Sequence, residues 1–358
     1  MSCCEIRLRA VYSKESQKKM FIQPKFTRSV ISFLSVAVAA LTACAPRAVT
    51  APAVGGVAAR PTEIRLDFAT YNPSSLVLKK FGWLEEDLKA DGVTVKWVQS
   101  AGSNKANELV NSNSIDFGST AGAAALLART NGVPQKTVYI YSKPEWTALV
   151  VPANSPIAKV ADLKGKKIAV TRGTDPFFFL LRSLKEAGLS QSDVEIVNLQ
   201  HADGRLALER GQVDAWSGLD PHMATVELKS NAKLLYRNID FNTYGTLNAR
   251  EDFIKQYPEY TKRVITAYER ARKWILDNPD EAAKILAEVA KIDLDIAKKQ
   301  LTERTVLKDI GIPGDSVRAA LEAVVPILKS EKLVADSTDP AKALSELIDA
   351  SFAQAVIK

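Results

Sequence analysis

Strand-like and helix-like segments alternate along residues 63–249, and this alternation limits the folds that the chain can adopt. Residues 63–70 alternate apolar and polar side chains as a strand does, and residues 74–90 carry apolar side chains at helical spacing. A strand over 93–98 and a helix over 104–111 are expected next. Because strand–helix alternation at this spacing is typical of parallel strands joined by helical crossovers, it predicts a mostly parallel sheet flanked by helices.

The pattern starts again in the second part of this region. The further segments expected are strands over 136–141, 147–151, 166–170, 194–199 and 244–249, helices over 176–187 and 202–210, and an almost wholly helical C-terminal region over 254–358. Each part also has a short strand that leads into a new helix. In the first part this helix is expected to begin at Ser119, and in the second part at Asp220. The chain is therefore predicted to be an α/β protein with two lobes, lobe 1 comprising residues 63–143 plus 245–358 and lobe 2 residues 144–244.

The candidate site follows from this arrangement. In open α/β sheets ligands bind beyond the carboxyl ends of the strands, where free N–H groups at helix N-termini attract anions. Two lobes that face each other would bring both sets of loops into one cleft. The candidate ligand-binding residues are Tyr71, Asn72, Ser74, Ser75, Gly118, Ser119 and Thr120 in lobe 1, and Arg172, Gly173, Thr174, Trp216, Asp220 and Tyr244 in lobe 2.

The lobe 1 candidates are polar or lack a side chain. Ser74 and Ser75 leave backbone N–H groups open to an anion, although a turn that serves only the fold is the alternative. Gly118 would let a ligand approach the backbone, and the hydroxyl groups of Ser119 and Thr120 would add hydrogen-bond donors.

The lobe 2 candidates are more ambiguous. Asp175 is interpreted as a structural cap of its helix, because an aspartate there bonds free N–H groups and repels an anion. If it faces the cleft instead, the ligand should carry a donor or cationic end, and Asp220 poses the same question. Arg172 could bind an anion or lie on the surface. Trp216 and Tyr244 could line the cleft or belong to the core.

Composition argues against several kinds of site. All three cysteines precede residue 45, so the folded body offers no disulfide, thiolate nucleophile or cysteine-based metal site. His201 and His222 are the only histidines, and both are predicted to be polar loop or cap residues. Residues 1–43 hold seven basic and two acidic residues, which leaves a net charge of +2 out of +7 for the remainder. No nucleic-acid partner is expected from that balance.

Residues 1–43 are predicted to form a signal peptide. They contain a basic segment and a 12-residue apolar run over 30–41 that ends in small residues. The run is shorter than the ~20 residues that a membrane-spanning helix needs. Met20 is predicted to be the true start, because residues 1–19 are too polar and charged for a signal segment.

The end of this leader, Leu-Thr-Ala-Cys, resembles the bacterial lipobox and implies that Cys44 is lipidated and anchors the mature chain. A signal for soluble secretion followed by a chance cysteine is the alternative. Residues 44–62, rich in Ala, Pro, Val and Gly, are predicted to be the lipidated tether. The expected location is the periplasm or cell surface.

Several segments in a fixed order carry a family resemblance. They are Ile-Asp-Phe-Gly-Ser-Thr at 115–120, Val-Ala-Asp-Leu-Lys-Gly-Lys-Lys-Ile-Ala-Val at 160–170, Arg-Gly-Thr at 172–174, Leu-Glu-Arg-Gly-Gln-Val-Asp-Ala-Trp at 208–216, Asp220-Pro221 and Asn-Pro-Asp-Glu-Ala at 278–282. Over roughly residues 64–350 the chain resembles the periplasmic solute-binding proteins of the aliphatic sulfonate/taurine/nitrate-binding group of ABC transporters. Asp175-Pro176 departs from this group, which has small hydroxyl residues there.

The resemblance implies a type II periplasmic-binding-protein fold that closes as a hinged clamp. It implies a monomer without a cofactor, which binds a small anionic or zwitterionic ligand and delivers it to an ABC permease and its ATPase. An organosulfonate or taurine-like ligand is expected, with the Asp220 loop at its amine or polar tail. Nitrate, a thiamine pyrimidine precursor or an aromatic carboxylate are alternatives on the same fold.

Enzymes also use this fold, among them porphobilinogen deaminase and the pyrimidine synthase of thiamine biosynthesis. The deaminase attaches its cofactor to a cysteine, and the synthase uses histidine and cysteine. Because no cysteine follows Cys44, the chain is predicted to be a binding protein without catalytic residues.

Overall fold

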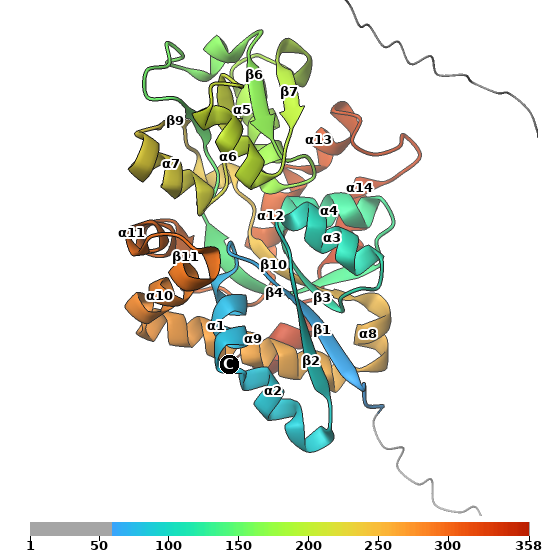
Figure 1. Cartoon of the computed structure of the whole chain (residues 1–358). Coiled ribbons are helices and arrows are strands. Elements are labelled where there is room, and N and C mark those ends of the chain that lie inside the picture. The colour runs from blue at the N-terminus through green and yellow to red at the C-terminus, as the bar shows by residue number, and fades with distance from the viewer. Residues whose placement is uncertain (1–58, 358) are drawn as a thin grey trace, which may run out of the picture. The chain divides into compact units, whose positions relative to one another are not determined.

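The computed structural model describes residues 59–357. The predictions about the signal peptide, Met20, Cys44 and most of the tether concern residues outside this range. Within it, no helix combines the length and apolarity needed to cross a membrane. Figure 1 shows two sheets in different halves of the described chain, one with α5, α6 and α7 and the other with α1, α8 and α9.

The first sheet has the strand order β11-β4-β10-β3-β1-β2. Its strands are β1 (Glu63–Phe68), β2 (Thr94–Gln99), β3 (Phe117–Ala121), β4 (Gln135–Pro144), β10 (Gly245–Arg250) and β11 (Thr305–Val306). β1 runs parallel to β2 and β3, whereas β10 runs antiparallel to both β3 and β4. The short β11, within the region expected to be helical, pairs antiparallel with the end of β4.

The second sheet has the order β7-β6-β8-β5-β9. Its strands are β5 (Leu149–Val151), β6 (Lys167–Val170), β7 (Glu195–Asn198), β8 (Ala215–Ser217) and β9 (Lys233–Tyr236). β6 is parallel to β7 and β8, and β5 runs against β8 and β9. The predicted α/β class, with two sheets flanked by helices and a helical C-terminal region, is confirmed. The prediction that the pairing in each sheet is mostly parallel is wrong, because β10 and β11 in the first sheet and β5 in the second run antiparallel to their neighbours.

Helices cover both sheets. The α-helices are α1 (Pro73–Phe81), α2 (Trp83–Leu88), α3 (Ser103–Asn111), α4 (Gly122–Thr130), α5 (Asp175–Glu186), α6 (His201–Glu209), α7 (His222–Ser230), α8 (Glu251–Gln256), α9 (Pro258–Asp277), α10 (Pro279–Ala290), α11 (Leu294–Lys298), α12 (Asp315–Glu322), α13 (Val325–Ser330), α14 (Pro340–Leu347) and α15 (Ser351–Val356). Short turns are η1 (Lys89–Asp91), η2 (Val160–Leu163), η3 (Gln191–Asp193), η4 (Ile239–Phe241) and the π-helical η5 (Lys299–Glu303). The single helix expected over 74–90 is interrupted because Gly82 adopts left-handed backbone angles, with φ of 64°.

The C-terminal helices join the two halves of the core. Leu321 of α12 and Leu344 of α14 belong to the same buried apolar cluster as Phe178 and Phe179 of α5. The same cluster includes Leu126 of α4, next to the first sheet. Because burying such side chains stabilises a fold by about 1.5–3 kcal/mol each, this region holds both sheets to a common core.

The chain passes between the sheets twice, from β4 to β5 and back from β9 to β10. Both crossovers are fastened to Asp175, the first residue of α5. Its carboxylate accepts hydrogen bonds from Trp146 Nε1 (2.8 Å) in one crossover, and from Thr243 N (2.8 Å) and Oγ1 (2.6 Å) in the other. The prediction that Asp175 caps α5 is wrong, because these side-chain and backbone donors from the crossovers occupy its carboxylate.

Candidate functional site

A cavity of about 370 Å³ lies between loops at the carboxyl ends of strands from both sheets. We call it the inter-sheet cavity. It is lined by Thr70, Gln99, Ser100, Ala101, Gln200, His201, Ala202, Pro221, His222, Val289, Ala290, Lys291 and Ile292. Its volume falls within the usual range of small-molecule sites, and its position is where ligands of such sheets bind.

Asp67 supports the first-sheet wall of this cavity. The sequence analysis did not identify it as a candidate residue. It is fully buried near the end of β1 and accepts hydrogen bonds from Ser119 N and Oγ (both 2.8 Å) and from Ser100 Oγ (2.6 Å). Burial raises the pKa of Asp67 to about 7, against the opposing effect of the Ser100 and Ser119 hydrogen bonds. Ser100, which lines the cavity, is thereby held in one orientation.

The predicted ligand residues at the start of α1 form an internal network. Asn72 caps α1 by accepting from Ser75 N (3.2 Å), and its amide donates to Ser119 Oγ (2.7 Å). The Tyr71 hydroxyl donates to the Ser119 carbonyl (3.0 Å), and Ser75 Oγ donates to the Asn72 carbonyl (2.7 Å). Among these, only the Ser74 hydroxyl is buried without a partner.

The prediction that a helix begins at Ser119 is wrong. Strand β3 continues to Ala121 because β10 pairs with it there, placing Thr120 opposite Thr246, and α4 begins at Gly122. The Thr120 hydroxyl accepts from Asn248 Nδ2 (2.7 Å) and is fully buried. Close packing against α3 requires a glycine at position 118, since a Cβ there would lie 2.9 Å from a methyl group of Val110. These candidates lie behind the cavity wall rather than in its lining.

The candidates at the start of α5 lie at different depths. Arg172 is exposed, and its guanidinium lies 4.9 Å from the ring centre of Phe177. Gly173 has a φ of 74°, which favours glycine, and a Cβ built on it would lie 3.7 Å from Asn104 Cβ at the start of α3. The Thr174 hydroxyl donates to the Thr171 carbonyl (2.6 Å). None of these residues lines the inter-sheet cavity.

Trp216 is fully buried in an apolar cluster that also contains Leu208, so it packs within the core of the second sheet. Tyr244 is half-buried and packs against the cluster of α5, with the Lys143 ammonium 5.9 Å from its ring centre. Of the two possibilities left open for these side chains, Trp216 therefore takes the core position.

Asp220 is bound by protein groups, although its neighbour Pro221 lines the cavity. Its carboxylate accepts from Ala224 N (2.8 Å) and from Arg304 Nη1 (3.1 Å). Burial raises the pKa of Asp220 to about 6, and Arg304 acts in the opposite direction. Arg304 also binds Glu227 of α7, so it ties the second-sheet loop to the segment between η5 and β11.

His201 and His222 are the cavity residues that the sequence analysis set aside. Burial, and secondarily His222, lowers the pKa of His201 to about 3; burial, and secondarily Arg205, lowers that of His222 to about 4. Both imidazoles are therefore neutral near pH 7. The available signal was position, because each begins a helix just after a strand of the second sheet. Within residues 59–357 no cluster of histidine, cysteine and acidic side chains suited to a metal ion was found.

Comparisons with known proteins agree with this geometry. Residues 81–282 match the model of the family described as NMT1/THI5 like. The putative aliphatic sulfonates-binding protein of Bacillus subtilis (strain 168) is 29% identical over 263 residues, covering 73% of this chain and 79% of that protein. Its namesake in Escherichia coli (strain K12) is 26% identical over 283 residues, covering 78% of this chain and 87% of that protein.

A solved structure extends the likeness to three dimensions. It is the alkanesulfonate-binding protein SsuA from Xanthomonas axonopodis pv. citri bound to MOPS, with a TM-score of 0.73 and 25% sequence identity. The match covers 80% of this chain and 99% of that chain. The recognised family resemblance and the type II periplasmic-binding-protein fold are thereby confirmed.

Proposed function

Since the chain belongs to the NMT1/THI5-like family, we propose that it is the extracytoplasmic solute-binding receptor of an ABC importer. It captures a small organosulfonate or taurine-like anion in the inter-sheet cavity and delivers it to the permease. The observation that carries this proposal is the position of the cavity, between the strand ends of two sheets, in a fold similar to a sulfonate-binding protein over nearly that protein's whole length.

The proposed clamp consists of two lobes, residues 63–143 plus 245–358 and residues 144–244. The two crossovers that Asp175 fastens together are its hinge. The buried pair between Arg304 and Asp220 is a contact across the lobes that must rearrange if they separate. The helices α12–α14 limit the motion, because they share a buried cluster with α5.

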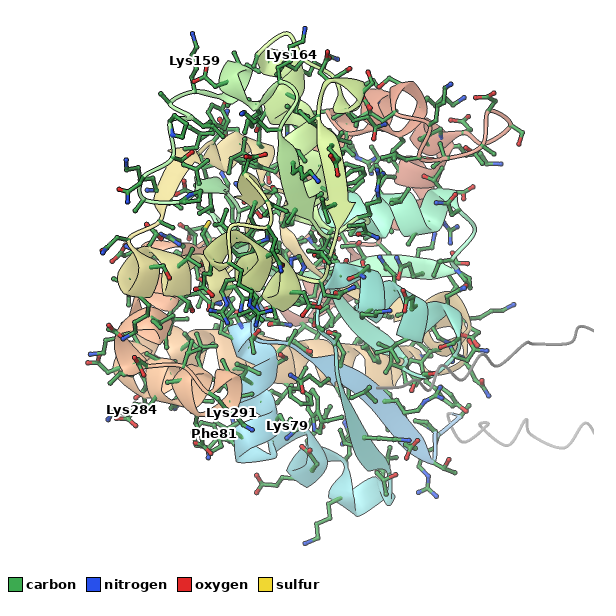
Figure 2. All side chains as sticks on the ribbon, turned by 45° about the horizontal axis from the view of Figure 1, so that its top comes forward. Lys79, Phe81, Lys159, Lys164, Lys284 and Lys291 are labelled. Atoms are coloured by element: carbon green, nitrogen blue, oxygen red, sulfur yellow. The ribbon has the colours of Figure 1, made fainter. Side chains whose placement is uncertain are left out.

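The electrostatics of the cavity suit one small anionic group. Lys291 is the only lysine or arginine among the lining residues, and no aspartate or glutamate lines the cavity. Lys291 follows α10 with a φ of 54° and is exposed; Figure 2 shows it near Lys79 and Phe81. The remaining polar side chains of the lining are neutral. They would offset little of the cost of removing several negative charges of a solute from water.

We propose that the chain catalyses no reaction. The relatives described above are binding proteins by name. A nucleophilic serine needs a histidine that accepts its proton. In the cavity lining, the Ser100 hydroxyl donates to Asp67 instead, and His201 Nδ1 contacts the Thr171 hydroxyl.

The anchor belongs to the same proposal. Lipidation of Cys44 would hold the receptor at the membrane surface, in the periplasm or at the cell surface, beside its permease and ATPase. The stretch that follows Cys44, in which Arg47 and Arg60 are the only charged residues, would serve as the tether.

A thermal-shift screen of the purified protein tests the proposal. The panel contains taurine, isethionate, ethanesulfonate, nitrate and a pyrimidine. A solute that binds only the folded protein, present at 100 times its Kd, stabilises it by about 2.7 kcal/mol and should raise the Tm by roughly 5 °C.

The matched variants introduce the same bulky side chain at two exposed alanines. Ala202→Trp lies in the cavity lining and should abolish the shift, whereas Ala335→Trp, outside it, should keep it. A panel in which no solute raises the Tm, or an Ala202→Trp protein that responds like the wild type, would refute the proposed function.

A further inference from the structure

Two buried hydrogen-bond acceptors, one from a helix after each sheet's strands, lie close together without a donor at the edge of the inter-sheet cavity. Asn104 Oδ1, at the start of α3, and His201 Nε2, at the start of α6, are both buried and have no hydrogen-bond partner. A Cβ built on Gly102 would lie 2.9 Å from each of these atoms, so both border the same point. His201 lines the inter-sheet cavity and is 2% exposed.

Local hydrogen bonds fix which nitrogen of His201 carries the proton. The single hydroxyl proton of Thr171 is donated to the Leu199 carbonyl at 2.7 Å. The Thr171 oxygen, 3.1 Å from His201 Nδ1, can therefore only accept, so Nδ1 carries a hydrogen. Burial keeps the ring neutral, with the pKa of His201 lowered to about 3. Nε2 then bears a lone pair and acts as an acceptor.

The residue before His201 supplies a third unpartnered acceptor to the cavity lining. Gln200 Oε1, adjacent to His201 and also in the cavity lining, is buried and unpartnered. A buried acceptor without a donor is unfavourable, and no lysine or arginine donates to these atoms among the hydrogen bonds of the described residues. A donor group with several protons, placed between the two sides, would satisfy them together.

Resting on the proposed function, we propose that the solute is an aminosulfonate-type zwitterion whose ammonium group binds between Asn104 and His201. The ammonium carries three N–H donors, which matches the acceptors present, and an alkanesulfonate with a methyl group at this end would leave them unpaired. Because Asn104 and His201 lie on helices that follow strands of different sheets, the same group also draws the two lobes together. These side chains therefore determine which sulfonate is accepted.

Isothermal titration with three matched sulfonates tests this assignment. Taurine, isethionate and ethanesulfonate share the sulfonate and the two-carbon spacer but end in ammonium, hydroxyl and methyl groups. The wild type should bind taurine at least about tenfold more tightly than ethanesulfonate, since a hydrogen bond to a charged group contributes at least that factor. His201→Phe should lose most of this preference while its affinity for ethanesulfonate changes little.

Asn104→Asp provides the decisive variant, because a carboxylate of the same shape accepts but cannot donate. It should increase the preference for taurine over isethionate. Asn111→Asp, the same change at an exposed position of α3, should not alter the preference. If the Asn104 amide instead donates directly to His201, Asn104→Asp will weaken binding of all three sulfonates without increasing selectivity, which overturns the inference.

The outcomes separate the two proposals. Equal affinity for all three sulfonates, unchanged by Asn104→Asp, overturns the aminosulfonate assignment and leaves the sulfonate receptor in place. Absence of binding for every sulfonate overturns the receptor itself.

Discussion

Replacing Asp175 with asparagine should change how the stability of the protein depends on pH. Burial raises the pKa of Asp175 from 3.8 to about 6, despite hydrogen bonds from Thr243 and Trp146. A carboxyl group whose pKa is higher in the folded state stabilises the fold at low pH and loses this contribution as the pH rises through about 6. Asparagine has the same shape but does not titrate.

The magnitude follows from these two pKa values. Between pH 5 and pH 8 the wild type loses about 1.4 kcal/mol of unfolding free energy through this one group, and Asp175→Asn loses none of it. The free energy of unfolding of Asp175→Asn, relative to wild type, should therefore rise by about that amount from pH 5 to pH 8. Asp67 and Asp220, whose pKa values are also raised, contribute to both proteins and cancel in the comparison.

Urea denaturation of both proteins at the two pH values measures this difference, provided that the m-values agree. Asp336→Asn, at an exposed position in the loop before α14, is the matched control and should show no pH-dependent difference. A difference between wild type and Asp175→Asn that stays constant from pH 5 to pH 8 would refute the reasoning. It would mean that the donors of the two crossovers keep Asp175 ionised in spite of its burial.

Three further outcomes are expected. Arg304→Met should cost about 3–5 kcal/mol of unfolding free energy at pH 8, because it leaves the buried Asp220 carboxylate without its cation, and a loss below about 1 kcal/mol in urea denaturation would contradict this. Gly102→Ala should weaken taurine binding roughly tenfold in titration calorimetry, since the new methyl group meets Asn104 and His201, and unchanged affinity would disprove the contact. The pKa of His201 is lowered from 6.5 to about 3, so its neutral form stabilises the fold above pH 6.5 and this contribution is lost on acidification. Between pH 7 and pH 5 the wild type should therefore lose about 2 kcal/mol more unfolding free energy than His201→Asn. Equal losses would show that the imidazole titrates normally.

The sequence predicted most elements of the two sheets because their side chains follow simple periodicities. The alternation over 63–70 and the apolar spacing of α5 depend on local contacts with one buried face. Strand β3 was misjudged at its end, since only pairing with β10, more than a hundred residues later, extends it to Ala121. The interruption at Gly82 was visible in the sequence as a glycine within a helical pattern.

The region of the candidate site was predictable, but its individual residues were not. The rule that ligands bind at the carboxyl ends of strands leads to the loops that form the inter-sheet cavity. Which side chains face the cavity depends on partners distant in sequence, such as Arg304, which occupies Asp220, and Asp67, which draws in Ser119. His201 was set aside because catalytic spacing was sought, whereas its unpartnered nitrogen becomes apparent only beside Asn104.

The most direct test is a crystal structure of the protein with the solute that gives the largest thermal shift. We expect one solute per chain in the inter-sheet cavity, in contact with Ser100, His201 and Lys291, with both sheets contributing contacts. A solute bound instead in the open hollow between η2 and α5, or a cavity that stays free of solute in crystals grown at saturating concentration, would contradict the account.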